Sequence, residues 1–320
     1  MIGVTGASGF VGRALCAHLA SQGQPVRRLL RQAAGDAMPG DRIVGNIGPD
    51  TDWRGALKGL ACVVHCAAHV HRMGAGGSGD NLATYRRVNT QGTRHLAQAA
   101  AQAGVRRFVF VSSVKVLGEA TPPGQPFRHD SPPSPQDPYG QSKWEAEQSL
   151  WPLAHETGIE VVVIRPPLVY GPGVGANFQR LMRWVASGLP LPLKSVRNRR
   201  SLVAIDNLID LIALCTHHPD AAGQTLLVSD GHDLSTPALI AGLGQAMGTH
   251  PRLWPVPVAC LLLAARLAGK GDTVARLVQS LQVDIAHTRA QLGWVPPFTV
   301  EQGLARAVTG QAGHDGRAAP

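Results

Sequence analysis

Cysteine is scarce in this chain, and the cysteines that are present show no pairing pattern. Five of the 320 residues are cysteines, and they lie in apolar stretches rich in alanine and leucine, at Cys16, Cys62, Cys66, Cys215 and Cys260. Their spacing matches neither a disulfide framework nor a metal site. We therefore expect reduced core thiols in a cytoplasmic protein, and we exclude a small secreted domain held together by disulfides.

Long apolar runs are missing as well. The chain begins without a basic stretch followed by an apolar run, so the sequence predicts no signal peptide. The most lipid-like segment, residues 255–269, has too short an apolar run to span a bilayer and contains Arg266. We expect a buried or surface-resting helix there and no transmembrane segment.

Acidic residues are outnumbered by basic ones, 21 against 30, which gives a formal net charge of +9. An excess of this sign can indicate a nucleic-acid partner. However, the arginines are scattered along the chain, and neither zinc-finger spacing nor an aromatic and basic platform is present. An anionic small substrate explains the charge equally well, so we predict no nucleic-acid partner.

The sequence does contain a regular alternation of strand-like and helix-like segments. Apolar runs typical of buried strands occupy residues 1–5, 25–30, 41–46, 62–68, 106–113 and 159–166. Residues 11–22 and 89–103, which lie between such runs, have the apolar spacing of helices. This order is typical of βαβ units, so we expect an α/β fold with a Rossmann-type, doubly wound parallel sheet.

The length and the apolar content of 44% fit one large domain or two smaller ones. We assign residues 1–170 to a dinucleotide-binding domain, to which residues 203–230 return. A smaller, mainly helical substrate domain is expected from residues 171–202 and 231–310, followed by a disordered tail at 311–320. Residues 121–138 are too rich in proline for a helix or central strand, so we expect an ordered excursion over the surface.

A glycine-rich turn follows the first strand-like run. In VTGASGFVGRAL, Gly6, Gly9 and Gly12 lie three residues apart, after a strand and at the start of a helix. Gly6 would permit a tight turn, Gly9 would let backbone amides approach a pyrophosphate, and Gly12 would let the helix pack closely on the strand. This context predicts a dinucleotide site.

The second strand-like run bears on the choice of cofactor. Sites for NAD place an Asp or Glu about twenty residues past the glycine turn, but PVRRLLRQ contains no carboxylate. Arg31 lies at the end of this run, with Arg27 and Arg28 nearby, and a guanidinium there can bind the 2′-phosphate of NADP. We therefore favour NADP(H) and leave NAD(H) open, the alternative being that these arginines are solvated surface charges.

A candidate catalytic group follows in DPYGQSKWEAE. Tyr139 and Lys143 lie four residues apart, which puts both on one face of a helix. An ammonium nearby, helped by an oxidised nicotinamide, lowers the pKa of a phenol, so that the tyrosine can exchange a proton with a substrate hydroxyl or carbonyl. The preceding strand-like run ends in Ser112 and Ser113, which could complete the site.

With these motifs the chain resembles the extended short-chain dehydrogenase/reductase family, in the branch of nucleotide-sugar epimerases, dehydratases and reductases. The strings TGASGFVG, HCAAHVH, VNTQGT, FVFVSS, YGQSK and IRPPLVYGPG carry the resemblance, which spans nearly the whole chain. It implies that Tyr139 is the catalytic acid/base, Lys143 its partner and ribose contact, and Ser113 the hydroxyl that holds the reacting sugar oxygen. Ser113 is preferred to Ser112 because it lies five residues before Gly118, as in the family.

The resemblance also implies binding residues and a homodimer formed through helices that include the one bearing Tyr139. Asn46 stands where the family often has an aspartate near adenine, and Asn89 supports the site. The substrate diphosphate would contact Asn177 and Arg200. Besides the glycines, Arg31, Tyr139 and Lys143, the implied cofactor contacts are Phe10, Val11, Asn46, Ile47, Ala67, Ala68, Asn89 and Pro166.

The two residues that directly follow Ser113 narrow the choice of reaction. Sugar 4,6-dehydratases resemble this chain but have Asp and Glu where it has Val114 and Lys115, and those carboxylates perform the elimination. The string SSVKVLGE looks most like bacterial reductases of UDP-4-keto-6-deoxy-N-acetylhexosamines, which serve O-antigen synthesis. The resemblance therefore implies NADPH-dependent reduction at C4 of such a sugar, with Lys115 either touching the substrate or lying solvated in its loop.

Two other functions stay open. A UDP-hexose or UDP-N-acetylhexosamine 4-epimerase needs the same serine, tyrosine and lysine but retains its cofactor. Arg31 favours the reductase over the epimerase. A non-enzymatic NADP-sensing regulator of the same fold typically lacks the tyrosine that this chain keeps. The histidines His65, His69 and His71 resemble a metal cluster only superficially, because no carboxylate or cysteine completes a set, so we predict no metal.

Overall fold

The computed structural model describes residues 1–70, 81–269 and 271–315. In these residues seven strands form one sheet, in the order β3-β2-β1-β4-β5-β6-β9, and every neighbouring pair is parallel. The strand order reverses between β1 and β4, which makes the sheet doubly wound and confirms the predicted Rossmann-type α/β fold. The strands are β1 (Ile2–Thr5), β2 (Val26–Leu30), β3 (Arg42–Ile43), β4 (Cys62–His65), β5 (Arg107–Val111), β6 (Glu160–Arg165) and β9 (Thr225–Leu227).

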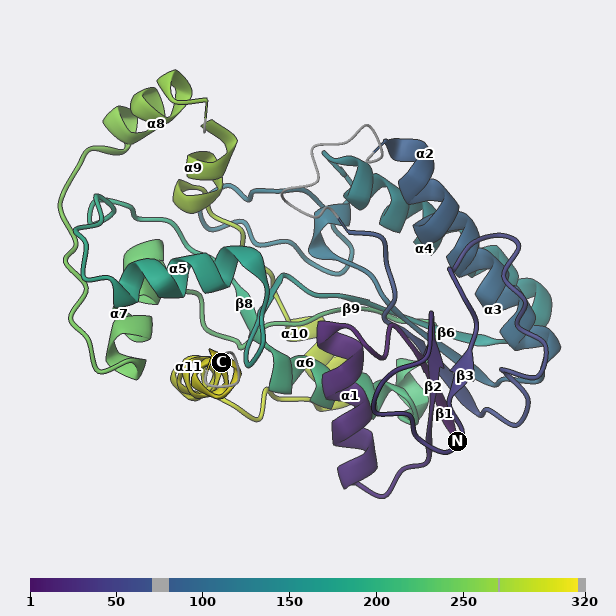
Figure 1. Ribbon diagram of the computed structural model, residues 1–320. Coiled ribbons are helices and arrows are strands. Elements are labelled where there is room, and N and C mark those ends of the chain that lie inside the picture. The colour runs from purple at the N-terminus through teal and green to yellow at the C-terminus, as the bar shows by residue number, and fades with distance from the viewer. Residues whose placement is uncertain (71–80, 270, 316–320) are drawn as a thin grey trace.

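Helices cover both faces of this sheet, which explains why its central strands are continuous apolar runs. On one face, Val4 and Val109 pack with α1 (Phe10–Ser21) and α6 (Ile205–Cys215). On the other face, Val63 and Phe108 pack with α3 (Gly92–Gln102) and α4 (Pro138–Thr157). Figure 1 shows α3 and α4 side by side, with the short helix α2 (Leu82–Tyr85) at one end of them.

A smaller group of elements lies at the other end of the molecule (Figure 1). Strands β7 (Leu168–Tyr170) and β8 (Leu202–Ala204) pair in parallel. Beside them α5 (Ala176–Ala186), α7 (Thr236–Ala246) and α11 (Val300–Asp315) share an apolar cluster that includes Phe178, Ile240 and Leu304. The chain re-enters the large sheet through α6 and β9, while the domain boundaries assigned from the sequence stay predictions. The remaining helices are α8 (Val258–Leu267), α9 (Gly271–Val278) and α10 (Ala286–Leu292).

The C-terminal segment differs from expectation. Helix α11 continues to Asp315, so residues 311–315 are helical, and residues 316–320 of the expected tail lie outside the described part. Two contacts hold the helix against the rest of the fold as far as Gly310. Ala307 is fully buried, and Gly310 lies so close to Pro172 that a Cβ on it would be 2.4 Å from the Pro172 Cβ. Burial of these turns extends the helix through tertiary packing.

The other segments singled out in the sequence behave as expected. Residues 121–137 form no helix or strand and touch the rest of the fold at a bridge between Phe127 and Val283. The lipid-like segment contains α8, which rests on the surface with Ala265 buried and Leu263 and Leu267 exposed. Among the helices of the described residues, none has the length and apolar character needed to cross a membrane.

Candidate active site

The glycine turn after β1 is built by close backbone approaches. Gly6 has a φ of +65°, and a Cβ on it would lie 2.7 Å from the backbone nitrogen of Ala67. A Cβ on Gly12 would lie 2.3 Å from the Gly6 carbonyl oxygen. Larger residues at either position would force the turn and α1 away from the sheet.

The same turn presents a helix N-terminus at the switch point of the sheet. The Gly9 N–H donates to the Gly6 carbonyl (2.8 Å), and Gly9 caps α1 with no side chain bonded to the first amides. Ala67 and Ala68 follow β4, the strand paired with β1. Amides at a helix start attract a pyrophosphate, and the switch point is where such folds bind dinucleotides. These residues therefore fit a dinucleotide.

The three arginines near the end of β2 have different surroundings. Arg28 donates to the carboxylates of Asp36 (2.9 Å) and Asp41 (2.6 Å), and these hydrogen bonds raise the Arg28 pKa above its usual range. Arg27 donates to the carbonyl oxygens of Ala56 (3.0 Å) and Lys58 (2.7 Å). Arg31 follows β2 and is exposed. Two of the arginines thus have structural partners, and Arg31 is the one that solvent and ligands can reach.

The other predicted cofactor residues surround this edge of the sheet. Phe10 and Val11 form the first turn of α1, and Asn46 follows β3, with its carbonyl accepting from Thr51 Oγ1 (2.9 Å). Ile47 packs against α3, because a Cβ on Gly92 would lie 2.8 Å from Ile47 Cγ2. The Pro166 carbonyl, just past β6, accepts from the Val114 N–H (3.0 Å).

The two serines after β5 are used in different ways. Ser112 is 3% exposed and donates to Glu147 Oε1 (2.5 Å), and the Glu147 carboxylate is paired with Arg165 (2.6 Å). Ser113 is partly exposed, and its Oγ accepts from the Lys115 N–H (3.2 Å). Ser112 therefore belongs to a buried polar cluster, while the Ser113 hydroxyl keeps its proton to donate, as the assignment of Ser113 requires.

Tyr139 and Lys143 lie on α4, as the spacing predicts. Burial is the main cause that raises the pKa of the Tyr139 phenol, with Asp137 and Tyr85 adding to it. These effects favour the protonated form of the phenol. A protonated phenol is the form that donates to a developing alkoxide.

The Lys143 side chain reaches the end of β5. Its Nζ donates to the Val111 carbonyl (2.7 Å) and lies 4.3 Å from the centre of the Phe110 ring. Burial lowers the Lys143 pKa to about 8, against the opposing effects of Cys66 and Glu147. The strand end that carries Ser113 and the helix that carries Tyr139 are thus tied together by Lys143.

Asn89 supports this arrangement from the π-helical turn Arg86–Gln91. Its Oδ1 accepts from the His69 N–H (2.7 Å), and its Nδ2 donates to the His69 carbonyl and to Ser142 Oγ (3.0 Å each). Asn89 therefore joins the loop after β4 to α4, one residue before Lys143. A π-helical turn of this kind is frequent at functional sites.

His65 and His69 have structural partners. His65 is buried between Thr5 Oγ1 (2.6 Å) and Thr93 Oγ1 (3.0 Å), and burial lowers its pKa to about 3. The His69 ring lies edge-on to the Tyr85 ring, and His71 lies outside the described residues. Within the described chain, no group of three or more His, Cys, Asp or Glu side chains could hold a metal.

The predicted substrate residues lie in different parts of the fold, and of these Lys115 contacts the catalytic Ser113 directly. Asn177 lies in the first turn of α5. The Arg200 guanidinium donates to the carbonyls of Arg276 (2.6 Å) and Gln279 (3.2 Å). Burial, then Arg276, lowers the Arg200 pKa. Lys115 is also held, since its Nζ pairs with Glu119 (3.0 Å) and with Asp137.

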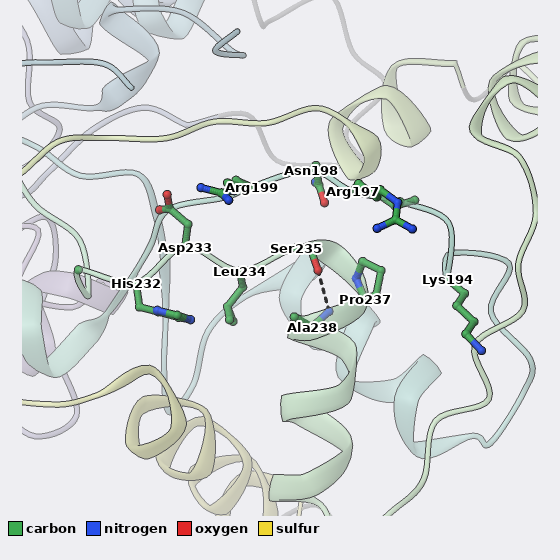
Figure 2. Close-up of a pocket in the computed structure, with 12 residues that line it drawn as sticks. Lys194, Arg197, Asn198, Arg199, His232, Asp233, Leu234, Ser235, Pro237 and Ala238 are labelled. Carbon is green, nitrogen blue, oxygen red and sulfur yellow. Dashed lines mark hydrogen bonds between the residues drawn. The ribbon is translucent and has the colours of Figure 1, made fainter. Parts of the chain in front are cut away.

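Figure 2 shows a pocket of about 690 Å³ in the smaller part of the molecule, between residues 194–199 and 231–238. Lys194, Arg197 and Arg199 line it. None of Ser113, Tyr139 and Lys143 is among its lining residues, so we place the chemistry at the carboxyl edge of the large sheet and not in this pocket.

Motif analysis missed three residues that position the site. Asp137 caps α4 by accepting from the Gly140 N–H (2.6 Å), Ser142 is bound by Asn89, and Glu147 holds Ser112. An Asp immediately before a proline at a helix start is a capping signal, so Asp137 could have been found. Nothing in the local sequence singles out Ser142 or Glu147.

Gly140→Ala is expected to lower the free energy of unfolding by about 1–3 kcal/mol, the usual cost of overpacking. A Cβ on Gly140 would lie 2.7 Å from the Lys115 carbonyl oxygen, so α4 would have to move from the turn that carries Ser113. Urea denaturation measures the change. Gly35→Ala is the control, because nothing lies within 4 Å of a Cβ there; equal stabilities for the two variants would contradict the close approach.

The chain has curated relatives that cover nearly its whole length. The chain is 47% identical over 303 residues to a UDP-glucose 4-epimerase of Vibrio cholerae, which covers 94% of this chain and 92% of that protein. It is 27% identical to the N-acetyl-alpha-D-glucosaminyl-diphospho-ditrans,octacis-undecaprenol 4-epimerase of Escherichia coli O157:H7, over 95% of this chain and 92% of the relative.

The fold also has close counterparts among solved structures. A UDP-glucuronic acid 4-epimerase from Bacillus cereus, solved in complex with NAD, matches with a TM-score of 0.77 at 20% identity, over 98% of this chain and 99% of that one. The model of the NAD dependent epimerase/dehydratase family matches residues 2–228. With its glycine turn, its doubly wound sheet and this match, the chain belongs to the NAD dependent epimerase/dehydratase family.

Proposed function

We propose that this protein is a 4-epimerase of a UDP-linked hexose or N-acetylhexosamine that works on a retained nicotinamide dinucleotide. The observation that carries the proposal is the 47% identity to the Vibrio cholerae UDP-glucose 4-epimerase over nearly the whole chain. It favours the epimerase over the C4 reduction that the string SSVKVLGE implies. The neighbouring 4-epimerase solved with NAD supports the cofactor class.

The residues of the site suit such a reaction. Gly6, Gly9 and Gly12 would hold the pyrophosphate, and Lys143 would reach the ribose. A bound nicotinamide would supply the chemistry of hydride uptake from C4 of the sugar and of hydride return to the opposite face. Ser113 donates a hydrogen bond to the oxygen on C4. Lys143 and the positive charge of an oxidised nicotinamide would lower the Tyr139 pKa, so that the phenolate can accept the hydroxyl proton as C4 is oxidised. The resulting phenol donates this proton back as C4 is reduced, so protons balance over one turnover.

A dehydratase does not fit the same site. Val114 is buried in the apolar core, and Lys115 is paired with Glu119 and Asp137. Elimination across C5 and C6 needs an acid and a base beside the sugar, and neither residue can be one. Because Tyr139 and Lys143 are both present, a purely cofactor-sensing regulator is also disfavoured.

NADPH-dependent reduction of a UDP-4-keto-6-deoxy-N-acetylhexosamine is the second candidate, and exposed Arg31 favours it. If Arg31 binds a 2′-phosphate, NADPH should bind more tightly than NADH, and Arg31→Ala should narrow the difference about tenfold or more, the worth of one charged hydrogen bond. Fluorescence titration with both cofactors measures it. The control is Arg42→Ala, because Arg42 is another exposed arginine, in β3.

One assay separates the two candidates. The enzyme is incubated with UDP-glucose and with UDP-N-acetylglucosamine without added cofactor, and in parallel with the keto-sugar and NADPH. We expect catalytic interconversion of the C4 epimers, with no net oxidation of nicotinamide. Stoichiometric oxidation of NADPH by the keto-sugar, without interconversion in the first arm, would assign the reductase instead.

A further inference from the structure

Lys115 contacts both halves of the catalytic site, and it does so with three different groups. Its backbone N–H donates to the Ser113 Oγ (3.2 Å). Its carbonyl oxygen lies against Gly140, within 2.7 Å of where a Cβ would be. Its Nζ pairs with Glu119 (3.0 Å) and with Asp137. Lys115 therefore touches both the turn of Ser113 and the start of α4.

Asp137 links the Lys115 side chain to the start of α4. One of its carboxylate oxygens accepts from the Gly140 N–H (2.6 Å) and caps the helix, while the other binds Lys115. Burial pushes the Asp137 pKa up, but the hydrogen bonds from Lys115 and Gly140 bring it below the usual range. The cap is therefore a charged carboxylate only two residues from Tyr139, and Lys115 supplies its counter-charge.

We propose that Lys115 is a positioning residue, which docks the start of α4 on the Ser113 turn and neutralises Asp137, the helix cap two residues before Tyr139. This inference rests on the proposed function, in which Tyr139 must exchange a proton. Under this proposal Lys115 does not contact the sugar, and it is not a solvated loop residue. Glu119 extends the network, because Arg276 of α9 lies 3.7 Å from its carboxylate.

Two other charged groups on the elements packed against α4 have partners of their own. Arg86 of the π-helical turn pairs with Glu145, and Arg165 of β6 pairs with Glu147. From α2, the Tyr85 ring faces the Tyr139 ring at 6.3 Å, and Lys143 lies one turn further along α4. Among the described residues, Asp137 is the carboxylate that acts on the phenol, and Asp137 adds to its raised pKa.

The test is a set of variants followed over pH. In Lys115→Met the Asp137 charge stays without its counter-charge, which disfavours the phenolate. The rising limb of kcat against pH should move to higher pH, and kcat at neutral pH should fall roughly ten- to hundredfold, the cost of a misplaced catalytic group. Lys115→Arg should recover most of the turnover, and Lys58→Met, at an exposed lysine outside the site, should match the wild type.

A double variant separates charge from docking. Asn is as good a helix cap as Asp, so Lys115→Met with Asp137→Asn removes both charges but keeps the cap. The pH limb should return toward that of the wild type. If Lys115 instead binds the sugar, KM should rise and the rising limb of kcat against pH should stay in place, both in Lys115→Met and in the double variant. That result overturns the proposal.

A second readout does not depend on which reaction the enzyme performs. The chain has three tyrosines, so the tyrosinate absorbance of the NAD⁺-loaded enzyme, minus that of Tyr139→Phe, follows Tyr139 alone. Lys115→Met should shift this titration to higher pH. An unshifted titration contradicts the inference. A shifted one supports it, even where the wild type turns over neither UDP-glucose nor the keto-sugar and the proposed function fails.

Discussion

Tyr139→Phe is expected to lower turnover by roughly two to four orders of magnitude, the usual contribution of a general acid/base. The substitution removes the hydroxyl that exchanges the proton with the oxygen on C4, while the ring stays packed against that of Tyr85. Cofactor affinity should be unchanged, because the glycine turn and Lys143 are intact. Steady-state kinetics and a cofactor titration on the same preparation measure the two effects.

Tyr170→Phe is the matched control. In the wild type the Tyr170 hydroxyl donates to Asp230 (2.7 Å) in the smaller part of the molecule, and it lies outside the catalytic group. The Tyr170→Phe variant should be less stable than the wild type but should keep its turnover per folded enzyme. Wild-type turnover in Tyr139→Phe would mean that another group exchanges the proton, and a parallel loss of cofactor binding would show that the phenol has a structural role as well.

Glu147→Ala is expected to lower the free energy of unfolding by about 3–5 kcal/mol, the cost of removing one partner of a buried ion pair. Glu147 is fully buried on α4, and the Arg165 side chain is 6% exposed on β6. The substitution leaves the Arg165 guanidinium in the core without its counter-charge and the Ser112 hydroxyl without its acceptor. Urea denaturation followed by far-ultraviolet circular dichroism measures the loss.

Glu145→Ala is the control for this prediction, because it lies on the same helix two residues earlier. Its partner Arg86 is 47% exposed, and exposed pairs are worth about 0–1 kcal/mol. Losses of similar size for the two variants would contradict the assignment of Glu147 as a buried structural charge. Glu147→Gln should lie between them, because its amide oxygen can still accept a hydrogen bond.

Local patterns in the sequence were sufficient for the type of fold and for the placement of Tyr139 and Lys143 on one helix. Alternating apolar runs and helical spacing predicted the parallel sheet, because strands buried on both faces must be apolar throughout. The positions of Gly6 and Gly12 predicted the turn, since only glycine accommodates that φ and that approach. Tyr139 and Lys143 were predicted because four residues make about one helical turn.

The tertiary structure decided the partners of the polar groups. Ser112 and Ser113 are adjacent and chemically identical, yet Ser112 binds Glu147, 35 residues away, while Ser113 is partly exposed and accepts from the Lys115 N–H. Lys115 was ambiguous in the sequence because its partner Asp137 is 22 residues distant, beyond the proline-rich excursion. Hydrophobic periodicity is a property of one segment, whereas the pairing of buried charges depends on which segments the folded chain brings side by side.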